Sequence, residues 1–375
     1  MPRKKAASRR STRKPRDAGH VTLDDIAQAC GLSRMSVSYA LRGNRRFVSE
    51  ANIAKVRAAA QRLGYDPATA HAARSLRYRK VDATVASYVA AMFFPVHKLN
   101  TQYYALLFQG VQEAFLADGF GVLSCSFDPE RGAVEEQLPP IFRRGDVDGA
   151  VIFTPNYPQS DLAAGLRAMP GFDHRPIISL LEPTPDSSLV QFDDEQIGRL
   201  QADHLLDLGH RQLLYFKNAA VHSYIVERRL QGVRQAIEAR RLDPAKHLHL
   251  APWVWHDPRG LETATRAVLK QFPKVTGVLT PNDGAGVPLA RMLRQLGKRI
   301  PDDLSVLGVD DCQPLLDPAE QNIWTTVRVP LEALGRTAAR VLIDQVLHHG
   351  AARSTTTLPT ELVIRKTTAP PRKGR

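Results

Sequence analysis

The apolar positions between residues 21 and 63 recur every three or four residues, in three short blocks separated by glycines. Thr22 begins the first block with an acid three residues later, as in a capping box, and Gly31 follows the end of that block. Ser33 can cap the second block and Ser49 the third. The pattern predicts three short helices with a tight turn between the first two.

From about residue 81 the pattern changes to short apolar runs, many of them β-branched, which alternate with amphipathic helical stretches. Such alternation is typical of parallel βαβ units. The predicted strands are residues 83–90, 121–125, 149–153, 176–181, 212–216, 277–279 and 305–309. In open sheets of this kind, ligands bind beyond the carboxyl ends of the strands, so we expect a ligand site there.

Length and composition narrow the class of protein. A chain of 375 residues is too long for one ordinary core, and its 43% hydrophobic and 24% charged residues are typical of globular proteins. No apolar run reaches the roughly 20 residues of a membrane-spanning helix, and no secretory signal is visible. The three cysteines, Cys30, Cys125 and Cys312, favour neither a disulfide framework nor a zinc site. We expect a cytoplasmic protein with no cofactor, metal or membrane contact.

The net positive charge of the chain lies in its first 80 residues. Residues 1–80 contain 19 lysines and arginines against 5 acids, whereas residues 81–375 contain 32 against 33. A basic module joined to a nearly neutral body indicates that the module binds a phosphate backbone and that the body does something else.

The second predicted helix has the side chains of a DNA-reading helix. Its inward side is apolar, so its other side is available to the major groove. Arg34 can bind guanine, Tyr39 offers a hydroxyl, and Met35 offers apolar contact to a thymine methyl. Ser38 lies on the same face, and the residues suited to phosphates are Thr22, Ser36, Ser38 and Asn44. The alternative, a three-helix packing unit with a solvated face, does not account for the positive charge beside it.

Two runs at these helices resemble the DNA-binding headpiece of the LacI/GalR (lactose/galactose repressor) family: VTLDDIAQACGLSRMSVSYALRG and FVSEANIAKVRAAAQRLGYDP. Further motifs follow in the family's order: DGAVIF, HLLDLGH, RRLQG, TPNDGAG, IPDDLSVLGVDD, TTV and LVIRKTT. The resemblance implies an all-α helix-turn-helix headpiece and an α/β effector domain like periplasmic sugar-binding proteins. That domain would consist of two doubly wound subdomains with three strand crossings and the ligand in the cleft between them.

The resemblance also sets the expected domain bounds. They are a disordered basic arm at 1–20, the helix-turn-helix domain at 21–66, a hinge helix at 67–80, an effector-binding and dimerisation domain at 81–369, and a tail at 370–375. The first subdomain would span about 81–194 and 327–352, and the second 195–326 and 353–369.

A hinge helix is implied at the family's Ala-Arg-x-Leu segment, where this chain has Arg74 and Leu76. Such a leucine is implied to wedge into the minor groove at the operator's centre. The stretch before it is about two residues longer than usual in the family, which leaves an ordinary linker leucine as the alternative.

The effector contacts are carried over one residue at a time. Arg229 in RRLQG stands at the ligand-gripping arginine, and Asp310 in GVDD stands at a carboxylate that accepts from ligand hydroxyls or ring nitrogens. Further positions are an aromatic platform, a polar contact and three first-subdomain residues: Trp255, Asn282, Asn100, Tyr103 and Asp193. The alternatives are that Asp310 caps a turn, that Arg229 forms a surface ion pair and that Trp255 is core.

The sequence therefore predicts a DNA-binding transcriptional regulator, and among regulators it favours a repressor. We expect a homodimer on a pseudo-palindromic double-stranded operator, controlled by a small effector, with a sugar or sugar derivative as the family's default. No P-loop, GxSxG or HExxH motif is present, so no enzyme is expected. The alternative is a DNA-architectural or nucleoid-type protein whose α/β domain only dimerises, without effector control.

Overall fold

The computed structural model describes residues 23–41, 48–63, 65, 87–95, 101–128, 131–143, 145–155, 158–169, 171–217, 223–252, 258–348 and 352–372. These residues fall into two compact units, one ending at Ala83 and the other beginning at Thr84. Some of the sequence predictions lie outside the described residues: the basic arm, the hinge helix, and the roles of Thr22, Asn44, Arg74, Leu76, Asn100 and Trp255.

The first unit contains the three predicted helices, α1 (Leu23–Cys30), α2 (Arg34–Leu41) and α3 (Glu50–Arg62). One side of each helix is buried in a shared core, because the apolar residues recur at helical spacing. The predicted caps are present: the Ser33 side chain accepts from the backbone N–H of Ser36 at 3.1 Å, and that of Ser49 accepts from Asn52 at 3.4 Å. Gly31 ends α1 with a φ of 60°, a conformation that suits glycine.

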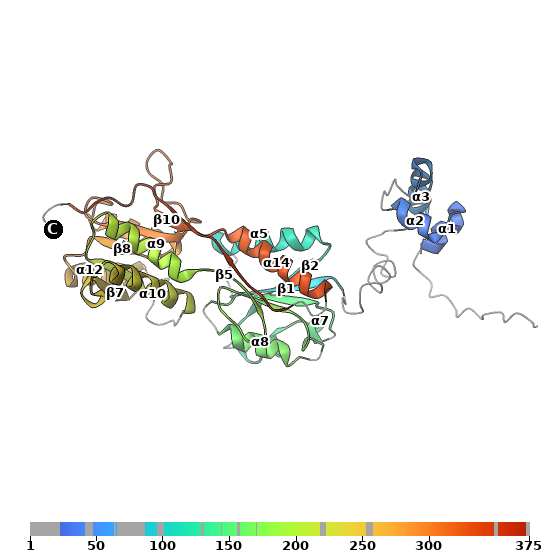
Figure 1. The fold of residues 1–375 in the computed structure, drawn as a ribbon, viewed down its shortest axis with the longest axis horizontal. Helices are drawn as coiled ribbons and strands as arrows, with labels where there is room; N and C mark the ends of the chain where they lie inside the picture. Colours follow the sequence, from blue (N-terminus) through green and yellow to red (C-terminus); the bar gives the residue numbers. More distant parts are fainter. Residues whose placement is uncertain are drawn as a thin grey trace, which may run out of the picture. The chain divides into compact units, whose positions relative to one another are not determined.

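The second unit contains two six-stranded sheets (Figure 1). The first sheet has the order β11-β5-β4-β3-β1-β2, with strands β1 (Val89–Pro95), β2 (Gly121–Phe127), β3 (Gly149–Ile152), β4 (Ile177–Leu180), β5 (Ser188–Phe192) and β11 (Thr355–Leu358). Its strand pairs are parallel. Its helices are α5 (Gln102–Ala117), α6 (Val134–Gln137), α7 (Pro140–Arg143), α8 (Gln159–Arg167) and α14 (Leu331–Leu347).

The second sheet has the order β12-β10-β9-β8-β6-β7, with strands β6 (Leu213–Lys217), β7 (Leu248–Pro252), β8 (Gly277–Leu279), β9 (Ser305–Asp310), β10 (Thr326–Arg328) and β12 (Glu361–Val363). The pairing of β10 with β12 is antiparallel, and the other pairs of this sheet are parallel. Its helices are α9 (Asp194–Asp207), α10 (Tyr224–Ala239), α11 (Pro244–His247), α12 (Pro258–Gln271) and α13 (Asp283–Gln295).

Both faces of each sheet are covered, which explains why inner strands such as β1, β3 and β9 are buried along their length. In the second sheet, Leu213 and Tyr215 of β6 pack against α9 and α10, whereas Leu214 and Phe216 pack against α12 and α13. In the first sheet, Ala91 and Phe93 of β1 face the cluster formed by α6, α7 and α8, and α5 packs beside α14 on the sheet. The fold class predicted from the sequence is confirmed.

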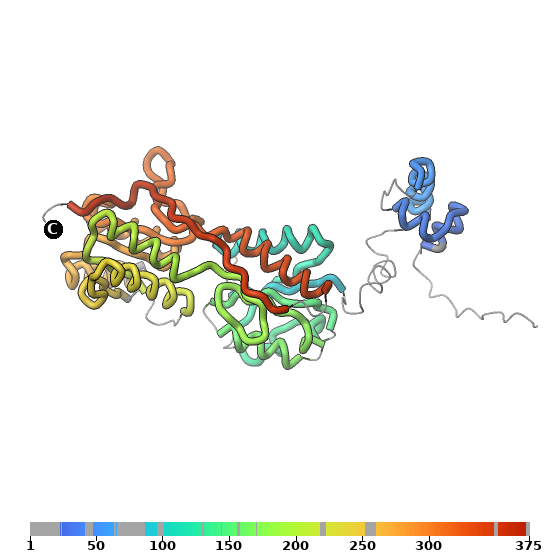
Figure 2. The backbone as a smooth tube through the Cα atoms, in the orientation of Figure 1, coloured from blue at the N-terminus to red at the C-terminus, as the bar shows by residue number. Residues whose placement is uncertain are grey.

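The chain crosses between the sheets three times, after β5, after β10 and after β11, as the tube in Figure 2 shows. One predicted boundary is wrong: residues 355–358 were expected in the second subdomain, but they form β11 and pair with β5 of the first sheet. The run of threonines in β11 carries no apolar signal because the strand lies at the sheet's edge and half of its side chains are exposed. The change of sheet therefore occurs between β11 and β12.

The first strand also differs from its prediction at 83–90. β1 begins at Val89 and continues to Pro95, because Met92, Phe93 and Phe94 extend the buried run. Within the described residues, no helix is both long enough and apolar enough to span a membrane.

Glycines let helices approach closely in this unit, and we predict a stability cost when one is filled. A Cβ on Gly232 of α10 would lie 1.9 Å from the backbone oxygen of Glu195 in α9. Gly232→Ala should therefore lower the free energy of unfolding by about 1–3 kcal/mol, measured by urea denaturation. Gly121→Ala is the matched control, since its Cβ would meet only the Tyr88 oxygen at 3.8 Å. Equal stability of the two variants would contradict the close contact.

Candidate functional site

A buried arginine lies where the carboxyl end of the second sheet meets the start of α9. The side chain of Arg229 in α10 is 5% exposed, and its Nε donates to Asp194 Oδ1 at 2.8 Å. Its Nη1 donates to the backbone oxygen of Pro281, which follows β8. Burial lowers the pKa of the guanidinium, but the negative charges of Asp194 and Asp310 outweigh that effect and raise it overall. Arg229 is thus a fixed cation, and the alternative of a surface ion pair is wrong.

Asp310 is the last residue of β9 and is also buried, with 5% of the residue exposed. Its φ of 116° is unusual for a residue with a side chain, and such strain is often found at binding sites. Burial raises the pKa of its carboxyl well above the ordinary value, the neighbouring carboxyl of Asp283 raises it further, and Arg229 lowers it in part. Asp310 therefore shares one charge cluster with Arg229.

A further carboxyl group, that of Asp283 at the start of α13, holds the segments at this end of the sheet together. It accepts hydrogen bonds from Trp324 Nε1 at 2.7 Å, from Thr326 Oγ1 at 2.8 Å and from the backbone N–H of Cys312 at 3.1 Å. Burial raises its pKa to about 6, although these hydrogen bonds act in the opposite direction. Asp283 thereby ties the segment after Asp310 to α13 and β10.

The first subdomain supplies an aromatic group to the same cluster. Tyr103 and Tyr104, in the first turn of α5, have ring centroids 6.0 Å and 5.5 Å from that of Phe153, which follows β3. Burial raises the pKa of the Tyr103 hydroxyl well above its ordinary value, Asp310 raises it further, and Arg229 lowers it. The Tyr103 phenol therefore lies within electrostatic range of both charged residues of the second subdomain.

The structure brings together Tyr103, Arg229 and Asp310, all of which the sequence singled out. The other two described candidates have structural roles: Asp193 caps α9 through the N–H of Gln196 at 3.0 Å, and Asn282 caps α13 through that of Ala285 at 2.8 Å. Their contact with an effector stays a prediction.

Sequence reasoning missed two carboxylates of this cluster. Asp194, and not its neighbour Asp193, holds Arg229, and Asp283 supports Asp310. A signal was present in the pairs at 193–194 and 282–283, where a helix cap is followed by an acid at the first helical position. Only the tertiary contact with Arg229 distinguishes which acid of the first pair is buried.

The cluster combines a buried cation and a buried carboxyl group with a partly buried phenol. Such groups fix the orientation of a polar ligand through a few directional hydrogen bonds, while aromatic rings pack against its apolar faces. Within the described ranges, no group of histidines, cysteines and acids has the arrangement of a metal site. The cluster is therefore suited to recognising a small polar molecule.

In the first unit, α2 exposes two of the side chains that were predicted to read DNA, Arg34 and Met35. Met35 is 65% exposed and Arg34 is exposed, whereas Val37 is completely buried. Tyr39 is half-buried and packs in part on the headpiece core. The Ser36 hydroxyl lies 2.9 Å from that of Ser33, so it takes part in the helix cap.

Comparisons with known proteins agree with both units. Residues 22–68 match the family model of bacterial regulatory proteins of the lacI family, and residues 202–368 match that of periplasmic binding protein-like domains. The HTH-type transcriptional regulator CelR of Thermobifida fusca is 31% identical over 350 residues, which cover 92% of this chain and 97% of CelR. The chain belongs to the LacI family of bacterial regulatory proteins.

Other relatives of this LacI-family regulator include the HTH-type transcriptional repressor PurR of Mannheimia succiniciproducens, 26% identical over 92% of this chain and 98% of PurR. Among solved structures, a CelR–cellobiose complex matches 93% of this chain and 100% of its own, with 26% identity and a TM-score of 0.63. A lac repressor dimer bound to operator matches 94% and 100%, with 23% identity and a TM-score of 0.66, and supports the fold.

The buried carboxyl of Asp283 predicts a specific pH dependence of stability. Its pKa of about 6 in the folded protein lies above the ordinary value of 3.8, so the native state favours the protonated form. The unfolding free energy should therefore fall as pH rises from about 4 to 6, by about 1–3 kcal/mol from this group. Asp283→Asn should flatten this slope in urea denaturation at several pH values. An identical slope in both proteins would contradict the assignment.

The exposure of Met35 predicts a loss of sequence recognition without a loss of fold. Met35→Ala should change the unfolding free energy by less than about 0.5 kcal/mol, because the side chain packs on little. It should weaken binding to the preferred duplex about tenfold, since apolar contact to a thymine methyl contributes to discrimination. The duplex would be selected from random DNA, with an unselected duplex as control. Equal weakening on both duplexes would argue against base contact.

Proposed function

We propose that this LacI-family regulator is a repressor whose operator binding is controlled by a sugar or sugar derivative held at Arg229, Asp310 and Tyr103. The observation that carries the proposal is that Tyr103 lies within electrostatic range of both Arg229 and Asp310. Arg229 and Asp310 come from the second subdomain and Tyr103 comes from the first. A ligand that bonds to all three would hold the two subdomains in one arrangement.

The charges of the cluster favour a polyol over an anion. Asp194 already neutralises Arg229 at 2.8 Å, so an anionic ligand would replace one carboxylate with another and would meet Asp310 as well. Hydroxyl groups instead donate to a carboxyl and accept from a guanidinium or a phenol. The LacI-family regulator of Enterococcus faecium solved with bound ribose, 26% identical to this chain with a TM-score of 0.63 over 75% of it, supports this chemistry.

Control would follow from a change in the relation of the two subdomains. The chain crosses between them three times, and such crossings act as hinges when a ligand closes one domain on the other. The effector then shifts the DNA-binding equilibrium only as far as it prefers one arrangement. Closure and its effect on the headpieces are part of the proposal.

The DNA-binding half of the proposal is a homodimer on a pseudo-palindromic operator. A helix-turn-helix dimer binds two half-sites related by its own two-fold symmetry. Arg34, Met35 and Tyr39 of α2 would contact bases, and the roles of Arg74 and Leu76 in the minor groove stay predictions. The protein would act in the cytoplasm, where such DNA lies, and without catalysis.

The alternative is a DNA-architectural protein without effector control. It does not account for the two buried carboxyl groups with raised pKa values, Asp194 and Asp310, beside Arg229. Burying charged groups lowers stability, and packing of the fold does not require these charges. Their presence therefore favours a binding role.

The deciding experiment is a thermal-shift screen of the full chain against sugars, sugar phosphates and purines, since a bound ligand stabilises the folded state by mass action. Tyr103→Phe and Asp310→Asn should each weaken binding of the hit about tenfold or more, because the first removes a hydroxyl and the second replaces an acceptor oxygen with an amide donor. Arg228→Gln is the matched control: Arg228 neighbours Arg229 in α10 but pairs with Glu195 at 3.0 Å and is 44% exposed. A hit that survives both site variants, or no hit from a broad set, would favour the architectural alternative.

A further inference from the structure

A separate pocket of about 350 Å³ lies on the first subdomain. Its lining comes from the end of α8, residues 173–176, the start of β4, Asp186 with the start of β5, the last turn of α14, and Arg353 before β11. The strands that contribute are parallel, so the pocket is at their amino ends. The cluster around Arg229 and Tyr103 lies at carboxyl ends, beyond β3 and β9, so the two sites are on opposite edges.

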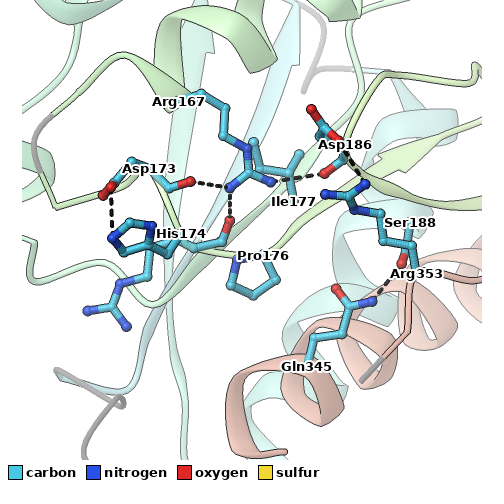
Figure 3. Close-up of a pocket in the computed structure, with 10 residues that line it drawn as sticks. Arg167, Asp173, His174, Pro176, Ile177, Asp186, Ser188, Gln345 and Arg353 are labelled. Atoms are coloured by element: carbon cyan, nitrogen blue, oxygen red, sulfur yellow. Dashed lines mark hydrogen bonds and ion pairs between the residues drawn. The ribbon is translucent and has the colours of Figure 1, made fainter. Parts of the chain in front are cut away.

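Arginines outnumber acids in the lining of this pocket, with Arg167, Arg175 and Arg353 against Asp173 and Asp186. Figure 3 shows the Arg167 guanidinium at its centre, with Asp173 on one side and Asp186 with Arg353 on the other. Arg167 donates to the backbone oxygens of Asp173 at 3.1 Å, of Asp186 at 3.0 Å and of Arg175. These acceptors are neutral carbonyls, so no carboxylate among the described residues bonds to the half-buried charge.

The remaining charges compensate this guanidinium only in part. Burial lowers the pKa of Arg167 and the repulsion from Arg353 lowers it further, whereas the negative charges of Asp186 and Asp173 raise it only in part. Arg353 itself pairs with Asp186 at 2.7 Å, but both side chains are more than 60% exposed, so that pair is weak and can open. An anion between the two arginines would relieve the repulsion and accept from both.

Neutral donors surround the same position. Gln345 at the end of α14 donates to the Ser188 hydroxyl at 2.6 Å, and the hydroxyl also accepts from the backbone N–H of Ser354 at 3.1 Å. Arg167 reaches its three carbonyl acceptors through Nη1 and Nη2, so within the described part of the chain its Nε hydrogen has no acceptor and can donate to a ligand. Guanidinium groups beside a hydroxyl are typical of sites for tetrahedral oxyanions.

The pocket also adjoins the point where the chain enters the first sheet. Arg175, which lines it, pairs with the fully buried Asp148 at 3.3 Å. Asp148 in turn accepts from the backbone N–H groups of Ser87 at 3.1 Å, Tyr88 at 2.6 Å and Val89 at 3.3 Å. These three residues precede or begin β1, so the ion pair connects the pocket to the first described residues of the second unit.

We propose that this pocket is a second, regulatory site that binds the phosphate group of a small phosphate ester between Arg167 and Arg353. Its occupancy is transmitted to residues 87–89 through Arg175 and Asp148. The site is distinct from the effector cluster and would let one regulator respond to a sugar and to a phosphorylated metabolite. The size of the pocket admits a small ester and not a macromolecule.

The test is calorimetric titration of the full chain with inorganic phosphate and with glycerol 3-phosphate, in chloride buffer at constant ionic strength. We expect saturable binding at one site per chain, and tighter binding of the ester. Arg353→Gln should weaken both about tenfold, since it removes one charged hydrogen bond. Arg167→Lys should weaken them as well while it retains the positive charge.

Two control variants distinguish binding in this pocket from a general attraction of anions to surface arginines and from binding at the effector cluster. Arg131→Gln also removes an exposed arginine of the same subdomain from an ion pair, with Asp128 at 3.2 Å, and should leave phosphate binding unchanged. Asp310→Asn alters the effector cluster and should also leave it unchanged. No saturable binding, equal weakening by Arg131→Gln, or a change caused by Asp310→Asn would overturn the proposed site, whatever becomes of the sugar effector.

Amide hydrogen exchange tests the regulatory part of the proposal. With phosphate bound, the exchange rates of the Ser87 to Val89 amides should change at least threefold, because their acceptor Asp148 shares Arg175 with the pocket. Arg353→Gln at the same phosphate concentration should show no change. Unaltered rates in the wild-type protein at saturating phosphate would overturn the connection to residues 87–89.

Discussion

The close contact of α9 with α10 is the constraint on which the proposed effector site depends. A Cβ on Gly198 would lie 1.8 Å from the backbone oxygen of Arg229, so only glycine allows this approach. The same approach places Asp194, at the first position of α9, within a hydrogen bond of the guanidinium. The close packing of the two helices at Gly198 thus positions the charged side chains of Asp194 and Arg229.

The buried charges of this cluster are not explained by a gain in stability. An ion pair inside a protein often contributes little, because desolvation offsets the attraction. Here Arg229 is opposed by Asp194, and Asp310 adds a second carboxyl whose pKa is raised by burial and by Asp283. Hydrophobic residues in place of the buried charges would avoid this desolvation cost. The charged arrangement instead offers directional donors and acceptors at the place where the two subdomains meet.

The sequence predicted the parts of the structure that local patterns determine. The caps at Ser33 and Ser49, the turn at Gly31 and most strand positions follow from spacing and residue type, and the structure confirms them. Five strands were not predicted: β5, β7, β10, β11 and β12. Of these, β11 carries no burial pattern because its threonines lie at the sheet's edge. At the candidate site, the resemblance to a family identified Arg229, Asp310 and Tyr103, which the structure brings together. It could not identify Asp194 as the partner of Arg229, since adjacent acids look alike in sequence and only tertiary packing buries one of them. The pocket at Arg167 was also missed, because its residues come from separate segments that no local motif connects.

The central claim is that one ligand, held across the two subdomains, controls DNA binding. Because such coupling is reciprocal, the most direct test is to measure the affinity of the sugar that emerges from the screen twice, for the free protein and for the protein saturated with its selected duplex. The account predicts two different affinities, whose ratio equals the factor by which the sugar changes the affinity for that duplex. Equal affinities would show that the site and the headpiece are not coupled.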